Sequence, residues 1–125
     1  MLTRLLIIDD DIILREIIKD SLGEYPIIID EAANGVEGLK KIAANRYDVI
    51  LTDIIMPEKE GFELIMEIKS NPTDIKIIAT TSGGSITANK YLEMAMELGA
   101  DAVIAKPFSE LKLVELINKL LGKNE

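Results

Sequence analysis

The sequence predicts an α/β fold in which helices cover both faces of an open, doubly wound parallel sheet, a three-layer sandwich. Five short apolar runs of strand length alternate strictly with five segments of helical periodicity, which is the pattern of repeated βα units. Right-handed crossovers between parallel strands place helices on both faces. With 125 residues, the chain is too short for a closed eight-stranded barrel. We therefore expect one domain over residues 1–125, with its core at about 4–121.

The first two βα units begin with runs that are wholly apolar, as strands buried on both faces should be. Their helical segments repeat apolar residues at spacings of three and four. The first segment stops before Gly23, a residue that commonly follows a helix, and Asn34 forms a turn before the second. We expect a strand at Leu5–Ile8, a helix at Ile12–Leu22, a strand at Ile27–Ile29 and a helix at Gly35–Asn45.

The last three units follow the same pattern. Gly99 and Gly122 stand where the fourth and fifth helices should end, and Ser109 stands where the fifth should be capped. The third helix offers four apolar side chains for burial, which are Phe62, Ile65, Met66 and Ile68. We expect strands at Val49–Thr52, Lys76–Thr80 and Ala102–Ala105, and helices at Gly61–Ser70, Ala88–Leu98 and Ser109–Leu121.

The composition narrows the classes of function. A formal net charge of −8 argues against direct binding to nucleic acid or to an anionic membrane. Cysteine and histidine are both absent, which excludes disulfides, thiolate metal sites and histidine-based acid–base chemistry in this chain. The N-terminus lacks the apolar stretch of a signal peptide, and no apolar run is long enough to span a membrane. A cytoplasmic protein is expected.

Polar residues stand at the carboxyl ends of four predicted strands. Asp9 and Asp10 follow the first strand, and Asp53 follows the third. A Thr-Thr-Ser run ends the fourth, and Lys106 ends the fifth. Parallel strands open their carboxyl ends on one edge of the sheet, so these residues should meet in one crevice. Crowded carboxylates repel one another unless a cation neutralises them, so we predict a site for a divalent metal and phosphate.

With these residues laid out, the sequence resembles the receiver domain of bacterial two-component response regulators. The resemblance covers Leu5–Leu121 and depends on an ordered combination of motifs, not on any one of them. It implies a single receiver domain with a flavodoxin-like fold and strand order 2-1-3-4-5. The motifs are Asp9-Asp10, Asp53 with Met56-Pro57, Gly61, Thr81, and Lys106-Pro107-Phe108.

The resemblance assigns roles to the acidic residues. Asp53 is the expected phosphoacceptor, and a cation must offset its repulsion from the incoming phosphoryl group. Mg²⁺ would be bound by Asp10 directly and by Asp9 through water, with Asp53 and the backbone carbonyl of Ile55 as further ligands. An aspartate can instead cap a loop or a helix. At the start of the first helix, that capping role suits Asp11 better.

The resemblance also assigns the hydroxyl and the lysine. Thr81 is expected to donate a hydrogen bond to a phosphoryl oxygen. The Thr-Thr-Ser run makes the alignment ambiguous by one residue, so Thr80 and Ser82 remain alternatives, and neighbours in a strand face opposite sides. Lys106 should pair with the carboxylate of Asp53 or with its phosphoryl oxygens, since lysine is a compact charge that suits phosphate. In this family, the peptide bond after that lysine is expected to be cis.

Two positions depart from the family pattern. Many receivers carry Tyr or Phe three residues before the site lysine, whereas this chain has Val103, which cannot act as a moving aromatic ring. We therefore expect the signal to pass through Ser82–Thr87 and the fourth helix. Ile55 offers no polar group to orient an attacking water, so slow self-dephosphorylation is expected.

The resemblance implies a signalling switch in a phosphorelay rather than a metabolic enzyme. A sensor histidine kinase or a histidine phosphotransfer protein would phosphorylate Asp53 in a Mg²⁺-dependent reaction, and the aspartyl phosphate would change the conformation. A downstream protein would bind the face made by the fourth helix, fifth strand and fifth helix, including Tyr91 and Met94. Because the sequence ends soon after its fifth predicted helix, output is expected through protein contact or phosphoryl relay; a domain cut from a longer regulator would look the same.

Two other classes of function are alternatives to a phosphorelay switch. A small Mg²⁺-dependent phosphohydrolase also uses an aspartyl nucleophile, but it usually places a second aspartate two residues later, where this chain has Ile55. A flavin-binding protein of this fold needs a phosphate-binding loop and aromatic residues to stack on the ring. Gly83-Gly84 is not followed by the Lys-Ser/Thr of a P-loop, and no GxGxxG motif is present.

Overall fold

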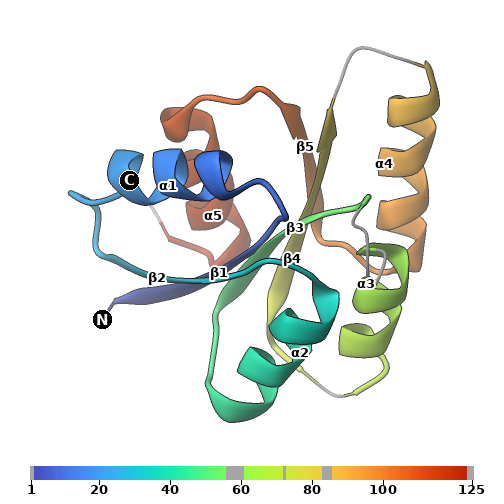
Figure 1. The fold of residues 1–125 in the computed structure, drawn as a ribbon, viewed down its shortest axis with the longest axis horizontal. Coiled ribbons are helices and arrows are strands. Elements are labelled where there is room, and N and C mark those ends of the chain that lie inside the picture. The colour runs from blue at the N-terminus through green and yellow to red at the C-terminus, as the bar shows by residue number, and fades with distance from the viewer. Residues whose placement is uncertain (1, 56–60, 72, 83–85, 124–125) are drawn as a thin grey trace.

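The structure is a computed structural model of the chain, and it describes residues 2–55, 61–71, 73–82 and 86–123. Strands and helices alternate along these residues in the predicted order (Figure 1). The strands are β1 (Thr3–Ile8), β2 (Ile27–Ala32), β3 (Val49–Asp53), β4 (Lys76–Ser82) and β5 (Ala102–Lys106). The helices are α1 (Ile12–Ser21), α2 (Gly35–Ala44), α3 (Gly61–Lys69), α4 (Ile86–Leu98) and α5 (Glu110–Leu120).

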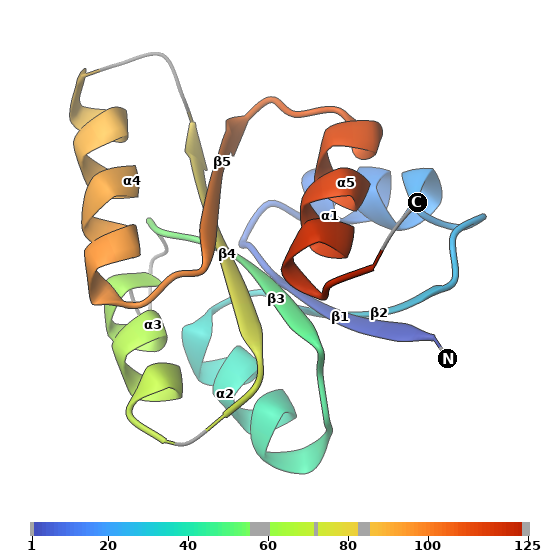
Figure 2. The same ribbon diagram turned by 180° about the vertical axis from the view of Figure 1, so that it is seen from behind.

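The five strands form one parallel sheet in the order β2-β1-β3-β4-β5. Helices α1 and α5 cover one face, and α2, α3 and α4 cover the other, as Figures 1 and 2 show from opposite sides. The predicted flavodoxin-like fold and its strand order are therefore confirmed. The carboxyl ends of all five strands open on the same edge of this sheet.

Each face of the sheet buries its own apolar cluster. Side chains alternate between faces along a strand, so β1 sends Leu6 and Ile8 to one cluster and Leu5 and Ile7 to the other. The first cluster includes Leu64 and Ile65 of α3 and Leu92 and Ala95 of α4. The second includes Ile18 of α1 and Leu113, Val114 and Ile117 of α5. Strands covered on both faces explain why the sequence shows apolar runs rather than alternation.

Local signals locate most helix ends. The Asp11 carboxylate caps α1 by accepting hydrogen bonds from the amides of Ile13 and Leu14, as expected. The Ser109 hydroxyl caps α5 by accepting from the amide of Lys112. Gly99 and Gly122 follow α4 and α5 with φ of 123° and 71°, a region that side chains disfavour. Within the described residues, no helix combines the length and apolar character needed to cross a bilayer.

Some boundaries and burials differ from expectation. β2 continues to Ala32, three residues beyond the predicted end, because Asp30 and Glu31 have polar partners beside this edge strand. Helix α4 starts at Ile86 rather than Ala88. Met66 of α3 was expected to be available for burial but is exposed, whereas Leu64, which was not named, is buried. Helix α1 also leaves apolar side chains exposed, namely Ile12, Ile13 and Ile17.

Candidate metal and phosphoryl site at the carboxyl edge of the sheet

Three carboxylates gather where β1 and β3 end. Asp9 and Asp10 follow β1, and Asp53 is the last residue of β3. One oxygen from each lies within 4.8 Å of the others, a spacing that a single cation can bridge. Asp9 and Asp53 are buried, while Asp10 is exposed. The predicted convergence of these three residues is therefore present, and a set of carboxylate oxygens is what Mg²⁺ prefers.

Lys106, the last residue of β5, lies between two of these carboxylates. Its Nζ is 2.8 Å from Asp9 Oδ2 and 3.0 Å from Asp53 Oδ2. Burial alone would lower the pKa of Lys106, but hydrogen bonds to Asp9 and Asp53 outweigh it and raise that pKa. The lysine therefore stays charged beside the acids. The Lys106–Pro107 peptide bond is cis, as expected.

Asp53 is held in a site that opposes its negative charge. Burial raises the pKa of its carboxyl, against the hydrogen bonds from Lys106 and from the Ile55 amide, which lower it. The Ile55 amide donates to Asp53 Oδ1 at 3.0 Å, and Lys106 occupies Oδ2. Burial still disfavours the charged form of this carboxylate despite its two donors, so a further cation nearby would stabilise it.

The start of α3 approaches Asp53 so closely that only glycine fits. The Gly61 amide donates to the carbonyl of Ile54 at 2.7 Å. A Cβ at Gly61 would lie 2.5 Å from the carbonyl oxygen of Asp53 and 2.5 Å from the Cα of Ile54, which is far inside van der Waals contact. Close packing against the backbone of Asp53 and Ile54 therefore explains why the predicted motif has glycine at position 61. Met56 and Pro57 of the same motif lie outside the described residues.

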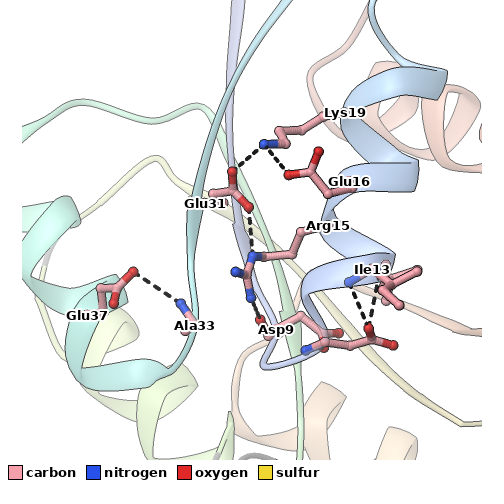
Figure 3. Close-up of polar contacts among 10 residues, drawn as sticks. Asp9, Ile13, Arg15, Glu16, Lys19, Glu31, Ala33 and Glu37 are labelled. Atoms are coloured by element: carbon pink, nitrogen blue, oxygen red, sulfur yellow. Dashed lines mark hydrogen bonds and ion pairs between the residues drawn. The ribbon is translucent and has the colours of Figure 1, made fainter.

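Asp9 has a partner for every polar group. Its amide donates to the carbonyl of Ala32 on β2 at 3.1 Å. Its Oδ1 accepts from the Asp11 amide at 2.9 Å, and its Oδ2 faces Lys106. Its carbonyl accepts from Nη1 of Arg15 at 2.6 Å, as Figure 3 shows. Arg15 was not singled out from the sequence, and its only signal there is a cation on α1 shortly after an acidic pair.

The hydroxyl residues lie on the other side of Asp53. Thr81 and Ser82 line a surface cavity of about 330 Å³ together with Asp53 and Ile55 of β3 and its loop, and with Tyr91 of α4. Thr80, the register partner of Asp53, is not part of that lining. Its Oγ1 is buried and has no hydrogen-bond partner among the residues that the structure describes.

The remaining predicted positions are Ile55, Val103 and the loop after β4. Ile55 is exposed beside Asp53, and its side chain presents only carbon to the cavity. Val103 is half-buried and packs against the cluster that contains α3 and α4. Gly83 and Gly84 lie outside the described residues, so the predicted route through Ser82–Thr87 is described only at its two ends.

Comparisons with known proteins agree with this arrangement. The family profile of the response regulator receiver domain matches residues 5–118. The chain is 33% identical over 121 residues to the chemotaxis protein CheY of Halobacterium salinarum, covering 97% of this chain and 98% of that protein. It is 30% identical over 125 residues to the response regulator MprA of Mycobacterium ulcerans, covering all of this chain and 53% of that protein. The chain thus spans about half the length of the MprA relatives it matches.

Solved structures give the same result. A CheY-like receiver domain protein of Methanospirillum hungatei aligns with a TM-score of 0.86 at 32% identity, over 98% of this chain and 95% of that one. A two-component response regulator of Clostridium difficile aligns with a TM-score of 0.86 at 30% identity, over 96% of both chains. With the profile match across most of its length, this chain belongs to the response regulator receiver domain family.

Proposed function

We propose that this chain accepts a phosphoryl group on Asp53 and passes the signal on by a change of conformation. The observation that carries this proposal is the bridge by which Lys106 Nζ joins Asp53 and Asp9 beside Asp10. An isolated aspartate at a strand end has no need of a half-buried lysine and two neighbouring acids. An aspartate that must receive another anionic group does need such compensation.

The acidic cluster would hold Mg²⁺ through Asp9, Asp10 and Asp53, with the backbone carbonyl of Ile55 as a further ligand. Oxygen donors that lie within 4.8 Å of one another suit a hard divalent cation. The three carboxylates and one lysine together carry a net negative charge, which such a cation would neutralise. When bound, the metal would offset charge on the acceptor and on the incoming phosphoryl group.

The phosphoryl donor would be a phosphohistidine on a sensor histidine kinase or a histidine phosphotransfer protein. An Asp53 carboxylate oxygen attacks phosphorus, the P–N bond breaks, and its electron pair stays on the leaving imidazole. The product is an aspartyl phosphate. Lys106 would remain within reach of the new phosphoryl oxygens, because it already contacts Asp53 at 3.0 Å.

The switch would act through the cavity between β4 and α4. In this proposal, the Thr81 hydroxyl turns toward the phosphoryl group and draws the end of β4 with it, while α4 responds through Tyr91, which lines the same cavity. Val103 packs against the α4 side of the core and has no ring to move. A shift between two states needs a coupling of only ~1–3 kcal/mol. The output face would be α4, β5 and α5, with Tyr91 and Met94 among its residues.

Intact mass spectrometry after treatment with acetyl phosphate and Mg²⁺ tests the acceptor. The wild-type protein should gain the mass of one HPO₃ unit, and the adduct should be released by hydroxylamine, as expected of an acyl phosphate. Asp53→Asn should gain none. Asp101→Asn, which changes a carboxylate at the opposite edge of the sheet, should still be labelled. A wild-type protein that stays unlabelled, or an Asp53→Asn variant that is labelled, would refute the proposal.

The phosphohydrolase alternative gains no support at this site. Ile55 stands where that class usually places its general acid, and its side chain is apolar and exposed. We therefore expect no turnover of a phosphomonoester such as p-nitrophenyl phosphate under the same conditions.

A further inference from the structure

Arg15 of α1 links the loop that carries Asp9 and Asp10 to the neighbouring strand β2. Its Nη1 donates to the backbone carbonyl of Asp9 at 2.6 Å, and its Nε donates to Glu31 Oε1 at 2.7 Å (Figure 3). Only 11% of its side chain is exposed. An arginine guanidinium carries several donors in one rigid plane, so the two bonds set its position together.

Glu31 is itself held in place. Lys19, one helical turn after Arg15, forms an ion pair with the other carboxylate oxygen of Glu31 and with Glu16. The hydrogen bond from Lys19, followed by that from Arg15, lowers the pKa of the Glu31 carboxyl, so Glu31 stays ionised and keeps both partners. The chain of contacts from Lys19 through Glu31 to Arg15 therefore ends at Asp9.

The carbonyl that Arg15 contacts belongs to the peptide group between Asp9 and Asp10. A peptide group is planar, so holding its oxygen fixes the plane and the direction in which the next Cα leaves. The other end of Asp9 is held by the hydrogen bond that its amide donates to the carbonyl of Ala32. Asp10 is exposed, so its carboxylate depends on this backbone for its direction.

We propose that Arg15 is a positioning residue, which orients the Asp9–Asp10 peptide so that both carboxylates face one cation. This inference rests on the proposed function of the acidic cluster as a Mg²⁺ site. Arg15 touches neither the metal nor the phosphoryl group in this proposal. It acts through the backbone of Asp9.

Geometry and charge make opposite predictions for the same substitution. Arg15→Gln removes a positive charge near three carboxylates, and by Coulomb's law alone this would strengthen Mg²⁺ binding. If Arg15 orients the acidic pair, the same substitution weakens Mg²⁺ binding. Residues that orient metal ligands typically contribute 10–100-fold to affinity, so we expect a loss of about tenfold.

The experiment measures Mg²⁺ affinity without any phosphodonor, by following backbone amide shifts in a Mg²⁺ titration. Arg15→Gln should bind about tenfold more weakly than the wild type. Arg15→Lys keeps the charge but has a single donor nitrogen in place of the guanidinium fork, so its Mg²⁺ affinity should fall between the other two. Because all three proteins give amide spectra, folding is read in the same samples.

Lys69→Met is the matched control. Lys69 also bridges a carboxylate and a backbone carbonyl, donating to Asp101 Oδ2 at 3.0 Å and to the carbonyl of Ile75 at 3.2 Å. Both partners precede strands, so this contact lies at the opposite edge of the sheet. Lys69→Met should lower stability and leave Mg²⁺ affinity unchanged.

The outcomes separate the two proposals. An Arg15→Gln variant that binds Mg²⁺ as tightly as the wild type, or more tightly, overturns the positioning role and leaves the proposed metal site intact. A Lys69→Met variant that loses as much affinity as Arg15→Gln also overturns it, since the effect would then be one of general stability. A wild-type protein that binds no Mg²⁺ overturns both.

Discussion

The two sides of Asp53 are built differently. On the acid side, which comprises Asp9, Asp10 and Lys106, Asp9 has a partner for its amide, its carbonyl and both carboxylate oxygens. The hydroxyl side comprises Thr80, Thr81 and the cavity beneath α4. There the buried Thr80 hydroxyl has no partner within the described part of the chain, and a cavity of about 330 Å³ lies beside Thr81.

We infer that the acid side is built to bind a metal and the hydroxyl side is built to move. A group that binds a metal gains from being held in place before the metal arrives, because little ordering remains to be done on binding. A group that must move when Asp53 is modified gains from open space and from few fixed contacts. On the α4 side, Phe62 of α3 packs edge to face on Tyr91 of α4, with ring centroids 5.8 Å apart.

The largest expected effect comes from breaking the acid side at its centre. Lys106→Met removes the cation between Asp9 and Asp53, so two buried carboxylates face each other without compensation. Labelling by acetyl phosphate should slow by about 10²–10³-fold, the usual cost of removing one preorganised charge. Mass spectrometry over time gives the rate.

The same variant has a second readout in the pKa of Asp53. The Lys106 hydrogen bond lowers that pKa against burial, so its loss should raise the pKa further above the usual value of 3.8. A carbon-13 NMR titration of the Mg²⁺-free protein measures this. Mg²⁺ should also bind more tightly, because a competing cation is gone. An unchanged labelling rate would contradict the role given to Lys106.

A smaller effect is expected from breaking the hydroxyl side. Thr81→Ala should leave Mg²⁺ affinity near that of the wild type and reduce the response of α4 to a phosphoryl mimic. A hydrogen bond to a charged group contributes ~1.5–3 kcal/mol, so the active state should lose at least about tenfold in population. Amide shifts of α4 with beryllium fluoride report it. Thr81→Ser should restore the response, and an α4 response that survives in Thr81→Ala would count against the proposal.

The smallest expected effect is on stability, and it concerns Thr80, the threonine that does not line the cavity beside Asp53. Thr80→Val replaces a buried hydroxyl, for which the described residues offer no partner, by a methyl group of similar size, so we expect the free energy of unfolding to rise by about 1 kcal/mol. Thr52→Val is the control, because the buried Thr52 hydroxyl donates to the carbonyl of Asp53 at 3.0 Å and its loss should destabilise. Urea denaturation measures both. A less stable Thr80→Val protein would mean that this hydroxyl has a partner in solution.

Much of the fold could be predicted because its signals are local. Apolar runs of strand length, helical periodicity, and the caps Asp11 and Ser109 each depend on neighbours within a few residues. The gathering of Asp9, Asp53 and Lys106 could also be predicted, because parallel strands must end on one edge. The strand order required the family resemblance, since periodicity gives strands without saying which of them are neighbours.

The amino-acid sequence by itself determined the alternation of strands and helices, the polar residues at the strand ends and the capping of two helices. Only the tertiary structure decided that Arg15 reaches the carbonyl of Asp9, that Thr81 and not Thr80 lines the cavity beside Asp53, and that Met66 is exposed. These features depend on contacts between different elements, on which face of the sheet a strand residue points to, or on which side of a helix faces the core. Strand register and helix orientation fix such contacts, and both emerge only when the sheet and its two helical layers pack together.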